Sequence, residues 1–262
     1  MERSGYGEKI IEEGYLMIQL SNDGVFRSTL LDNFPKIAHG FTTRQFGNMS
    51  SVEARNLFMK NHNVNSNLSV SQEQIHGSVI HTVTPAEFGT VVQNSDGIVY
   101  KDSDNQSKHP ILIVRVGDCV PLLFFDPKTQ IIGVAHAGWK GSVRHITKEM
   151  IRAFIDLGAE AGNIFVLMGP SICQKCYEVA GDVAMQFQKE FPNNKIISKI
   201  EQKWHVDLVE ANYQDCIDSG IDRSTIDFDK NLCTYEKKEL FYSWRRKTEP
   251  FGEIMGYIGY TS

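Results

Sequence analysis

The chain has 262 residues, 41% of them hydrophobic, which is enough to bury a substantial core without a disulfide or a cofactor to hold the fold. Its 27 basic and 32 acidic residues give a formal net charge of -5, so no overall basic field would attract nucleic acid or an anionic membrane. No apolar run approaches the roughly 18 residues of a membrane span, and the stretch MERSGYGEKIIEEG carries acids where a signal peptide needs an apolar core. We expect a soluble, cytoplasmic protein that binds neither nucleic acid nor membrane.

Short apolar runs typical of β-strands recur along the chain, separated by Gly, Asn, Asp and Pro. Many are continuously apolar rather than alternating, which indicates sheets covered on both faces. In chain order they are YLMIQL (15–20), VIHTV (79–83), GIVY (97–100), ILIVRV (111–116), PLLFF (121–125), QIIGVAH (130–136), NIFVLMG (163–169), LFYSW (240–244) and IMGYIGY (254–260). The polar stretch NHNVNSNLS, residues 61–69, is typical of a surface loop.

The clearest helix is predicted from Ser142 to Leu157, because apolar residues recur there at helical spacing. Ser142 can cap its start and Gly158 can end it. Two further helices are predicted over residues 178–191 and 207–219. We find no internal repeat and no long linker, so we expect a single α/β domain over residues 1–262, with layers of helix and sheet.

Five cysteines in a chain of this length do not resemble the dense, even framework of small secreted domains. Free thiols or metal ligands are therefore expected. Cys173 and Cys176 have the C-x-x-C spacing of metal ligands, but no companion pair is evident, and packing near a turn is the alternative. A cytidine-type zinc deaminase would also need an H-x-E motif, which the chain lacks.

The stretch from Val120 to Gly141, VPLLFFDPKTQIIGVAHAGWKG, predicts a β-hairpin that ends in a histidine among small residues. If Phe125 pairs with Ile131, Cys119 lies beside Ala137, and a slip of one residue pairs Cys119 with His136 directly. Opposed Cβ atoms in a sheet lie about 4.5–5.5 Å apart, so either register brings the thiol close to the imidazole.

A thiol and an imidazole at this distance could share a metal ion, or the imidazole could deprotonate the thiol to make a nucleophile. A third ligand would favour the metal site over the nucleophile. Most lone histidines, however, are simply hydrogen-bonded side chains, so each candidate must be weighed against that default. His76 stands out because Gln74, His76 and Gly77 form a polar, small-residue entry to a β run. The candidates for the third ligand are His39, His76, His81, His145 and His205.

Seven motifs occur in an order that resembles a known family across roughly residues 15–260. They are HGFTTR (39–44), QIHG (74–77), DGIV (96–99), GDCVPLLFFD (117–126), VAHAGWKG (134–141), GPSICQKCYEV (169–179) and CT followed by FYSWRR (233–246). On these motifs the chain is similar to the family once named for a "laccase domain", now regarded as purine nucleoside phosphorylases of the YfiH type.

The resemblance implies a YfiH-like layered α/β sandwich with mixed sheets, and Zn²⁺ held by His76, Cys119 and His136. Such a His-Cys-His set leaves the fourth tetrahedral position open, as in catalytic zinc sites. The implied reaction is phosphorolysis of adenosine, inosine or guanosine to the base and ribose 1-phosphate, with adenosine deamination as a further activity. The implied partners are therefore purine nucleosides and phosphate.

Phosphorolysis needs an anion site, and we predict Arg44, which closes the HGFTTR loop, and Lys140, which follows His136, as its cations. A planar or a point cation near Gly-rich backbone suits an anion. Ordinary surface charge is the alternative for each. Asp118 could orient a metal ligand or could simply pair with backbone amides.

The chain departs from the family pattern at Gly117, where Ala is common, at Trp244, where Tyr is usual, and at Gly252-Glu253, where Gly-Arg is frequent. A multicopper oxidase is rejected because it needs about ten histidines, many in His-x-His pairs, and this chain has 8 histidines and no such pair. Two alternatives stay open: a Cys-His hydrolase using Cys119 and His136, and a non-catalytic zinc-binding interaction protein. The preferred nucleoside, the proton donor and the oligomeric state are not predicted.

Overall fold

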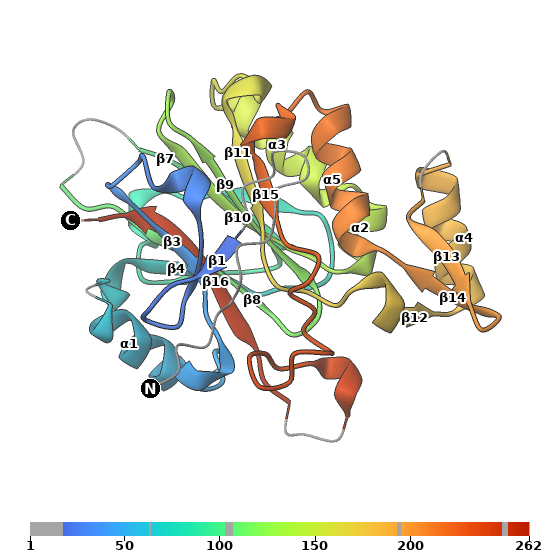
Figure 1. Cartoon of the computed structure of the whole chain (residues 1–262). Coiled ribbons are helices and arrows are strands. Elements are labelled where there is room, and N and C mark those ends of the chain that lie inside the picture. Colours follow the sequence, from blue (N-terminus) through green and yellow to red (C-terminus); the bar gives the residue numbers. More distant parts are fainter. Residues whose placement is uncertain (1–17, 63, 103–106, 193–194, 248–250, 262) are drawn as a thin grey trace.

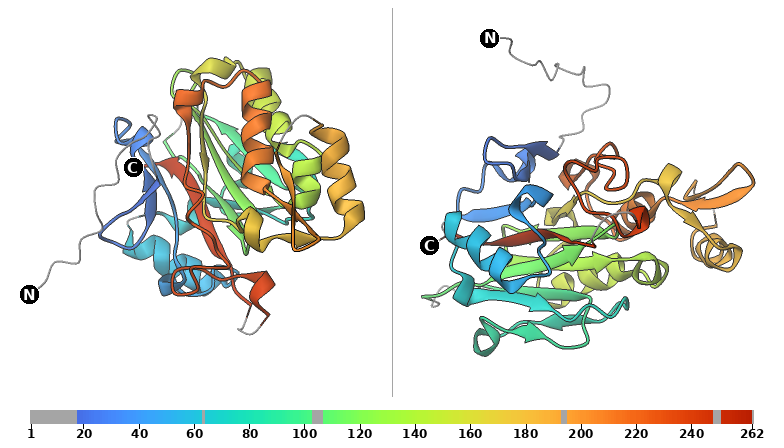
Figure 2. Two further views of the ribbon diagram at one scale, coloured as in Figure 1. Left: turned by 45° about the vertical axis from the view of Figure 1, so that its right-hand side comes forward. Right: turned by 90° about the horizontal axis from the view of Figure 1, so that it is seen from below.

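The computed structural model describes residues 18–62, 64–102, 107–192, 195–247 and 251–261. Two large β-sheets pack face to face in the centre, and helices cover their outer faces, so the main body has the layer order helix, sheet, sheet, helices (Figure 1). A small third sheet and its helix lie at one side of this body (Figure 2). The predicted layered α/β sandwich with mixed sheets is confirmed.

The first sheet has seven strands in the order β1-β2-β3-β16-β8-β4-β6. Their bounds are Ile18–Leu20, Phe26–Ser28, Ile37–Phe41, Ile254–Tyr260, Ile111–Val116, Ser69–Gln72 and Val91–Val92, in that order. Helix α1 (Val52–Asn61) covers the outer face, where its Phe58 and Met59 pack against Ile113 of β8 and Met255 of β16. Because β1 begins at Ile18, the first half of the predicted strand 15–20 lies outside the described residues.

The second sheet has six strands in the order β15-β11-β9-β10-β7-β5. Their bounds are Ile226–Phe228, Phe165–Met168, Val120–Asp126, Ile131–Ala137, Gly97–Lys101 and Ile80–Thr82, in that order. The outer face is covered by α2 (Trp139–Val143), α3 (Ile146–Asp156) and α5 (Leu208–Asp218), as Figure 1 shows.

Alternate residues of the central strands β9 and β10 point into different cores, as the two-residue repeat of a strand requires. Leu123 and Val134 face the first sheet, whereas Leu122 and Ala135 face the helices. Both strands are buried along their whole length. Burial on both faces explains why these runs are continuously apolar in sequence.

The third sheet has the order β12-β14-β13 and packs against α4. Its strands are Glu178–Val179, Lys203–Val206 and Ile197–Ile200, and α4 is Gly181–Glu190. The predicted helix over 178–191 is therefore wrong in its first residues, which pair as β12 with β14. Short 3-10 helices, η1 to η8, are Thr29–Leu31, Arg44–Phe46, Ser66–Leu68, Pro85–Glu87, Ala161–Asn163, Gln174–Cys176, Arg223–Thr225 and Trp244–Arg246.

The β9–β10 hairpin forms, but neither predicted register is right. Ile131 pairs with Asp126, so His136 pairs with Pro121 and Ala137 with Val120. The strand runs one residue further than expected because the Asp126 carboxylate accepts hydrogen bonds from Lys128 N (2.9 Å) and Thr129 Oγ1 (2.6 Å), which closes the turn behind it.

The helix predicted over 142–157 is divided into α2 and α3. His145 adopts a left-handed conformation (φ 56°) and its Nδ1 bonds the buried Asp215 carboxylate (2.8 Å), so the chain changes direction before Ile146. Ser142 consequently lies inside α2 and does not cap a helix. Gly158 (φ 103°) follows the end of α3, as predicted.

Several smaller predictions have clear outcomes. The helix over 207–219 is confirmed as α5, with Asp207 accepting the N–H of Glu210 (2.9 Å) as its cap. The LFYSW run forms no strand, and the 61–69 loop contains the end of α1 and the turn η3. All five cysteines are free, and within the described ranges no helix is long and apolar enough to cross a membrane.

Candidate metal centre

His76, Cys119 and His136 converge at one end of the second sheet. Their ligand atoms, one from each side chain, all lie within 4.8 Å of one another, and the two imidazole centroids are 4.7 Å apart. His136 is buried, Cys119 is half-buried and His76 is exposed, so the group opens to solvent on the His76 side. The structure thus brings together the three residues that the family resemblance implies as ligands.

The hairpin register explains how the thiol reaches the imidazole. Because His136 pairs with Pro121, Cys119 stands two positions from the residue opposite His136, on the same face of the sheet. Diagonal neighbours of this kind remain within side-chain reach. The closeness of Cys119 and His136 was therefore predicted correctly, although both predicted registers of the hairpin were wrong.

Asp96 fixes both histidines and is a positioning residue that the sequence analysis did not single out. The fully buried carboxylate bonds His136 Nδ1 (2.9 Å) through Oδ1 and accepts the N–H groups of His76 (2.9 Å) and Gly77 (2.6 Å). These bonds hold His76 at an unusual positive φ of 58°. The only sequence signal for this role was the position of Asp96 at the head of the DGIV motif.

The bond from Asp96 determines which imidazole nitrogen of His136 is available. Nδ1 is occupied, so Nε2 is left to face the thiol, the usual arrangement of a histidine ligand held by a carboxylate. Burial opposes ionisation of Asp96, yet the hydrogen bonds from His136, Gly77 and His76 lower the pKa of its carboxyl. A charged carboxylate is thereby kept behind the histidine.

Cys119 and His136 favour each other's charged form. Burial would raise the pKa of the Cys119 thiol, but His136 and then His76 outweigh it and lower that pKa to about 7. Burial would likewise lower the pKa of His136, but Cys119 and Asp96 raise it to about 9. The pair can therefore present a thiolate near neutral pH, the form that binds metal or attacks an electrophile.

Gly138 leaves the space into which the three ligand candidates point. A Cβ on this residue would lie 3.1 Å from Cys119 Sγ, 3.2 Å from His76 Cδ2 and 3.6 Å from His136 Cε1. The backbone of Gly138 is in the ordinary extended region (φ -74°), so its conformation does not require glycine. Here glycine provides volume between the ligands rather than flexibility.

Asp118 does not orient a metal ligand. Its buried carboxylate accepts hydrogen bonds from Thr234 Oγ1 (2.6 Å), Ser243 Oγ (3.0 Å) and the backbone N–H of Arg245 (2.8 Å). Of the two predicted roles, pairing with backbone amides is observed for one partner, Arg245, and the other two partners are side-chain hydroxyls. These bonds also explain why LFYSW is not a strand, since the segment turns to reach Asp118.

A cavity of about 360 Å³ lies close to the three ligand candidates, although none of them lines it. Trp139, which directly follows Gly138, forms one wall. Tyr177 forms another, and the charge of the Cys119 thiolate helps to raise the pKa of its hydroxyl. The Arg245 guanidinium lies 5.0 Å from the centre of the Tyr177 ring and donates to Glu178 O (2.8 Å). The cavity is lined by Trp139, Tyr177, Glu178, Val179, Ala180, Val183 and Arg245.

The two predicted phosphate contacts lie in different surroundings. Lys140 is exposed at the start of α2, with Nζ 5.7 Å from the centre of the Trp139 ring, so it is beside the cavity. Arg44 donates to Lys238 O and lies over the Tyr242 ring at 4.9 Å, in contact with the segment that carries Arg245. The sequence analysis did not single out Arg245, although it quoted the FYSWRR motif that contains it.

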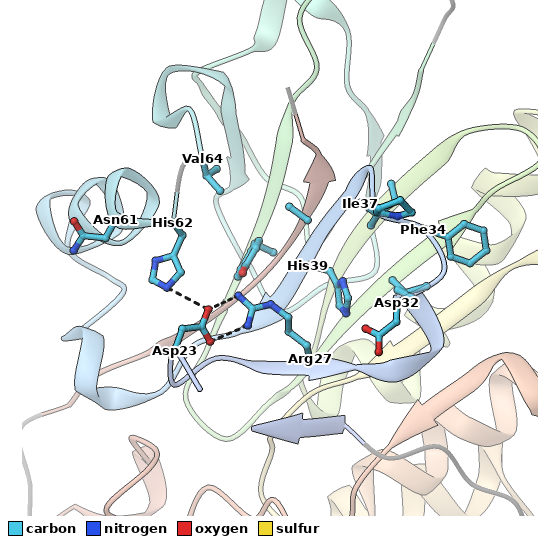
Figure 3. A pocket seen from close by; sticks show the side chains of 13 residues that line it. Asp23, Arg27, Asp32, Phe34, Ile37, His39, Asn61, His62 and Val64 are labelled. Carbon is cyan, nitrogen blue, oxygen red and sulfur yellow. Dashed lines mark hydrogen bonds and ion pairs between the residues drawn. The ribbon is translucent and has the colours of Figure 1, made fainter. Parts of the chain in front are cut away.

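The other histidines considered as third ligands lie elsewhere. His39 Nε2 accepts the N–H of Ser28 (3.1 Å) and lines a separate cavity of about 500 Å³, shown in Figure 3. Burial lowers its pKa to about 4, so it is neutral near pH 7. The partners of the remaining three are Glu87 for His81, Asp215 for His145 and the Gln174 carbonyl for His205.

The family model described as "Multi-copper polyphenol oxidoreductase laccase" matches residues 39–261. The chain belongs to this laccase-domain family. Among curated relatives, "Purine nucleoside phosphorylase YlmD" of Bacillus subtilis is 33% identical over 201 residues, covering 72% of this chain and 70% of the relative. "Adenosine deaminase RL5", from an unknown prokaryotic organism, is 34% identical over 139 residues, covering 52% of this chain and 53% of the relative.

Solved structures of laccase-domain proteins share the fold. YfiH of Bacillus licheniformis superposes with a TM-score of 0.81 at 25% identity, covering 92% of this chain and 98% of that one. YlmD of Geobacillus stearothermophilus gives 0.83 at 24% identity, covering 94% of this chain and all of that one. The family and fold implied by the sequence motifs are therefore confirmed.

The departures from the laccase-domain pattern have local explanations in this structure. Glu253 lies 3.4 Å from Arg115, so the acid has its own basic partner. Trp244 is 63% exposed and packs edge-on against Phe251. A Cβ on Gly117 would meet Phe251 Cε2 at 3.2 Å, so glycine in place of the usual alanine lets this segment pack closely.

Proposed function

We propose that the chain is a zinc-dependent purine nucleoside phosphorylase. It would cleave adenosine, inosine or guanosine with phosphate to the free base and ribose 1-phosphate. The observation that carries this proposal is the convergence of His76, Cys119 and His136 beside an aromatic cavity, in a family whose curated relatives include purine nucleoside phosphorylases.

The three side chains fit Zn²⁺ in both chemistry and space. Two imidazole nitrogens and one thiolate are ligands that zinc prefers, and the Gly138 backbone leaves room among them. Zn²⁺ bound by three protein ligands would supply Lewis acidity at an open fourth position. Asp96 would hold the proton at Nδ1 of His136 and keep Nε2 available for the metal.

The adjacent cavity suits a nucleoside. Trp139 and Tyr177 offer aromatic faces to a purine, and base–aromatic stacking contributes about 1–3 kcal/mol per base. Arg245, which lines the cavity, and Lys140, beside it, would attract the phosphate, and we retain Arg44 as a further phosphate contact on the neighbouring segment. These residues would hold the two substrates next to each other, which lowers the entropic part of the barrier.

Two related activities are separable by experiment. Adenosine deamination is a second proposed activity, supported by the relative named adenosine deaminase. A Cys-His hydrolase is favoured by the lowered pKa of Cys119 beside the raised pKa of His136. The hydrolase would be inactivated by thiol alkylation and would keep its activity after metal removal. The five free cysteines support a reducing, cytoplasmic location for either enzyme.

The test is chromatographic. Zinc-loaded protein is incubated with adenosine or inosine, with and without phosphate, and free base and ribose 1-phosphate are followed. Phosphate-dependent release of both products supports the phosphorylase, and inosine formed from adenosine supports the deaminase. Absence of all three products from zinc-loaded protein would contradict the proposal and favour the non-catalytic zinc-binding alternative.

A further inference from the structure

A second group of sulfur atoms lies outside the candidate metal centre. The Sγ atoms of Cys173, Cys176 and Cys233 all lie within 4.8 Å of one another. Cys233 is buried, whereas Cys173 and Cys176 are half-buried, so the group reaches the surface on one side. Cys233, 57 residues beyond Cys176 in the chain, is the companion that the sequence analysis did not find for the C-x-x-C pair.

The local backbone presents these sulfurs as a metal-binding turn does. Cys173 precedes the 3-10 turn η6 and Cys176 is its last residue, and the hydrogen bond from Cys176 N to Cys173 O (3.0 Å) closes the turn. Cys173 N donates to Cys233 Sγ at 3.3 Å. C-x-x-C turns that present both thiols to one point are common in zinc sites.

Cys233 is surrounded by hydrogen-bond donors that favour its thiolate. The Cys173 thiol is the strongest, and the backbone N–H groups of Cys173, Glu236 and Tyr235 add to it. Such donors offset the charge of a thiolate, the form that binds metal.

A fourth donor is available at the open side. Glu236 Oε1 lies 3.6 Å from Cys176 Sγ and 3.6 Å from Lys175 Nζ, so its carboxylate already faces the sulfurs. Zinc–sulfur bonds of about 2.3 Å place the sulfurs of a tetrahedral site about 3.8 Å apart. Only a small approach of the three side chains is then required.

We propose that Cys173, Cys176 and Cys233 form a second metal site for a thiophilic ion such as Zn²⁺, with the Glu236 carboxylate or water as fourth ligand. Soft thiolate sets select zinc or univalent copper over harder ions. Sites dominated by cysteine are typically structural, which separates this one from the His-Cys-His centre.

The position of this second site indicates a structural role for the metal. Ser171 and Cys233 form a parallel bridge, and Thr234 bonds both Ser171 O (3.0 Å) and the Asp118 carboxylate (2.6 Å). A metal here would join the 173–176 turn to the segment that carries Ser243 and Arg245, both of which hold Asp118 next to Cys119. It would therefore stabilise the wall of the substrate cavity.

The experiment is a count of bound zinc that does not depend on catalytic activity. Full-length chain is reduced, loaded with Zn²⁺, freed of excess metal and analysed by mass spectrometry for metal content. We expect two zinc ions in the native chain, one in His136→Ala, one in Cys176→Ser and none in the double variant. Cys216→Ala, which removes a buried thiol outside both groups, should retain two.

Cobalt distinguishes the two centres. Co²⁺ bound by three thiolates gives a stronger sulfur-to-metal charge-transfer band than Co²⁺ bound by one, so His136→Ala should keep the stronger band and Cys176→Ser should lose it. Cys176 is half-buried, so its replacement is better tolerated than that of buried Cys233.

Two outcomes would overturn the second site. One is a single zinc that is absent from His136→Ala and unchanged in Cys176→Ser. The other is a disulfide between Cys173 and Cys233 in unreduced protein together with no zinc gained on reduction. Neither outcome bears on the phosphorylase proposal, which concerns the other centre.

Discussion

Two cavities in the described part of the chain differ in the chemistry of the residues around them. The larger, about 500 Å³, contains His39, His62 and the Asp23–Arg27 pair, whose guanidinium bonds both carboxylate oxygens at 2.8 and 2.7 Å (Figure 3). The smaller, about 360 Å³, adjoins the three metal-ligand candidates. In the larger cavity Asp23 and Arg27 pair with each other, whereas beside the smaller a thiol and two imidazoles converge on one open point.

The two histidines of the larger cavity are held by the surrounding packing. His62 Nδ1 bonds Phe58 O (2.7 Å) and its ring stacks on Phe58 at 4.1 Å, so it is held as part of the packing. His39 is buried and neutral. Perturbed titratable groups indicate function only when they can reach a ligand together.

The largest expected effect comes from removing one ligand. His136→Ala should abolish zinc binding at the His-Cys-His centre and, with it, phosphorolysis, because the remaining two ligands do not hold the metal. His62→Ala, in the larger cavity, is the matched control and should keep both. Metal content and base release measure the two effects, and zinc retained at this centre in His136→Ala would remove His136 from the ligand set.

Filling the space between the ligands should have nearly as large an effect. Gly138→Ala places a Cβ 3.1 Å from Cys119 Sγ, so we expect zinc affinity to fall at least about 100-fold with the fold intact, since the φ of -74° suits alanine. Gly162→Ala, which would meet nothing within 4 Å, is the control. Affinity is measured by competition with a chelator, and equal affinities in the two variants would show that the ligands do not point to this space.

The charge pairing at the metal centre predicts a pH dependence for alkylation of Cys119. With its pKa lowered to about 7, the zinc-free thiol should react half-maximally near pH 7. At that pH about 15-fold more of it is thiolate than for an ordinary cysteine of pKa about 8.5. Reactivity is lost as pH falls below 7. His136→Ala should move the midpoint upward, because only His76 then opposes the effect of burial.

Alkylation is followed by peptide mass spectrometry, with Cys216, whose thiol is buried and has a raised pKa, as the internal reference. Zinc should protect Cys119 in the native chain. A midpoint near 9 in the native chain would show that the imidazole does not act on the thiol.

Asp96→Asn tests positioning rather than ligation. The amide cannot accept from both His136 and the backbone N–H groups of His76 and Gly77, so zinc affinity should fall about 10–100-fold, the usual cost of losing a carboxylate behind a histidine ligand. Asp102→Asn disrupts a similar pair with His109 (2.9 Å) away from the metal centre and should leave zinc affinity unchanged.

The smallest effect is expected in the wall of the cavity. Trp139→Ala should raise KM for inosine about tenfold with zinc content unchanged, because stacking is worth about 1–3 kcal/mol and 1.4 kcal/mol is tenfold in affinity. Trp204→Ala, on the third sheet, is the control. An unchanged KM would place the purine outside this cavity.

The sequence predicted the layers and two of the helix ends because those features depend on local chemistry. Strands buried on both faces read as unbroken apolar runs, and Asp207 and Gly158 are residues that cap and end helices by their own side chain or backbone. Proximity of Cys119 to His136 was also predictable, since a hairpin brings its two ends together whatever its exact register.

The features that were missed depend on contacts between distant parts of the chain. The break at His145 relies on Asp215, 70 residues away, and the joining of Cys233 to the C-x-x-C turn spans 57 residues. Asp96 reaches His136 from a neighbouring strand. The spacing of residues along a single sequence does not show which distant residues lie close together in the fold.

The most direct test of zinc-dependent phosphorolysis is a zinc titration in which the activity is measured at each step. Zinc-free protein is given increasing Zn²⁺, and ribose 1-phosphate formed from inosine and phosphate is measured at each occupancy. We expect a rate that rises with filling of the His76–Cys119–His136 centre and no rise at all in His136→Ala. An equal rate in zinc-free and zinc-loaded protein, or a rise that His136→Ala retains, would contradict it.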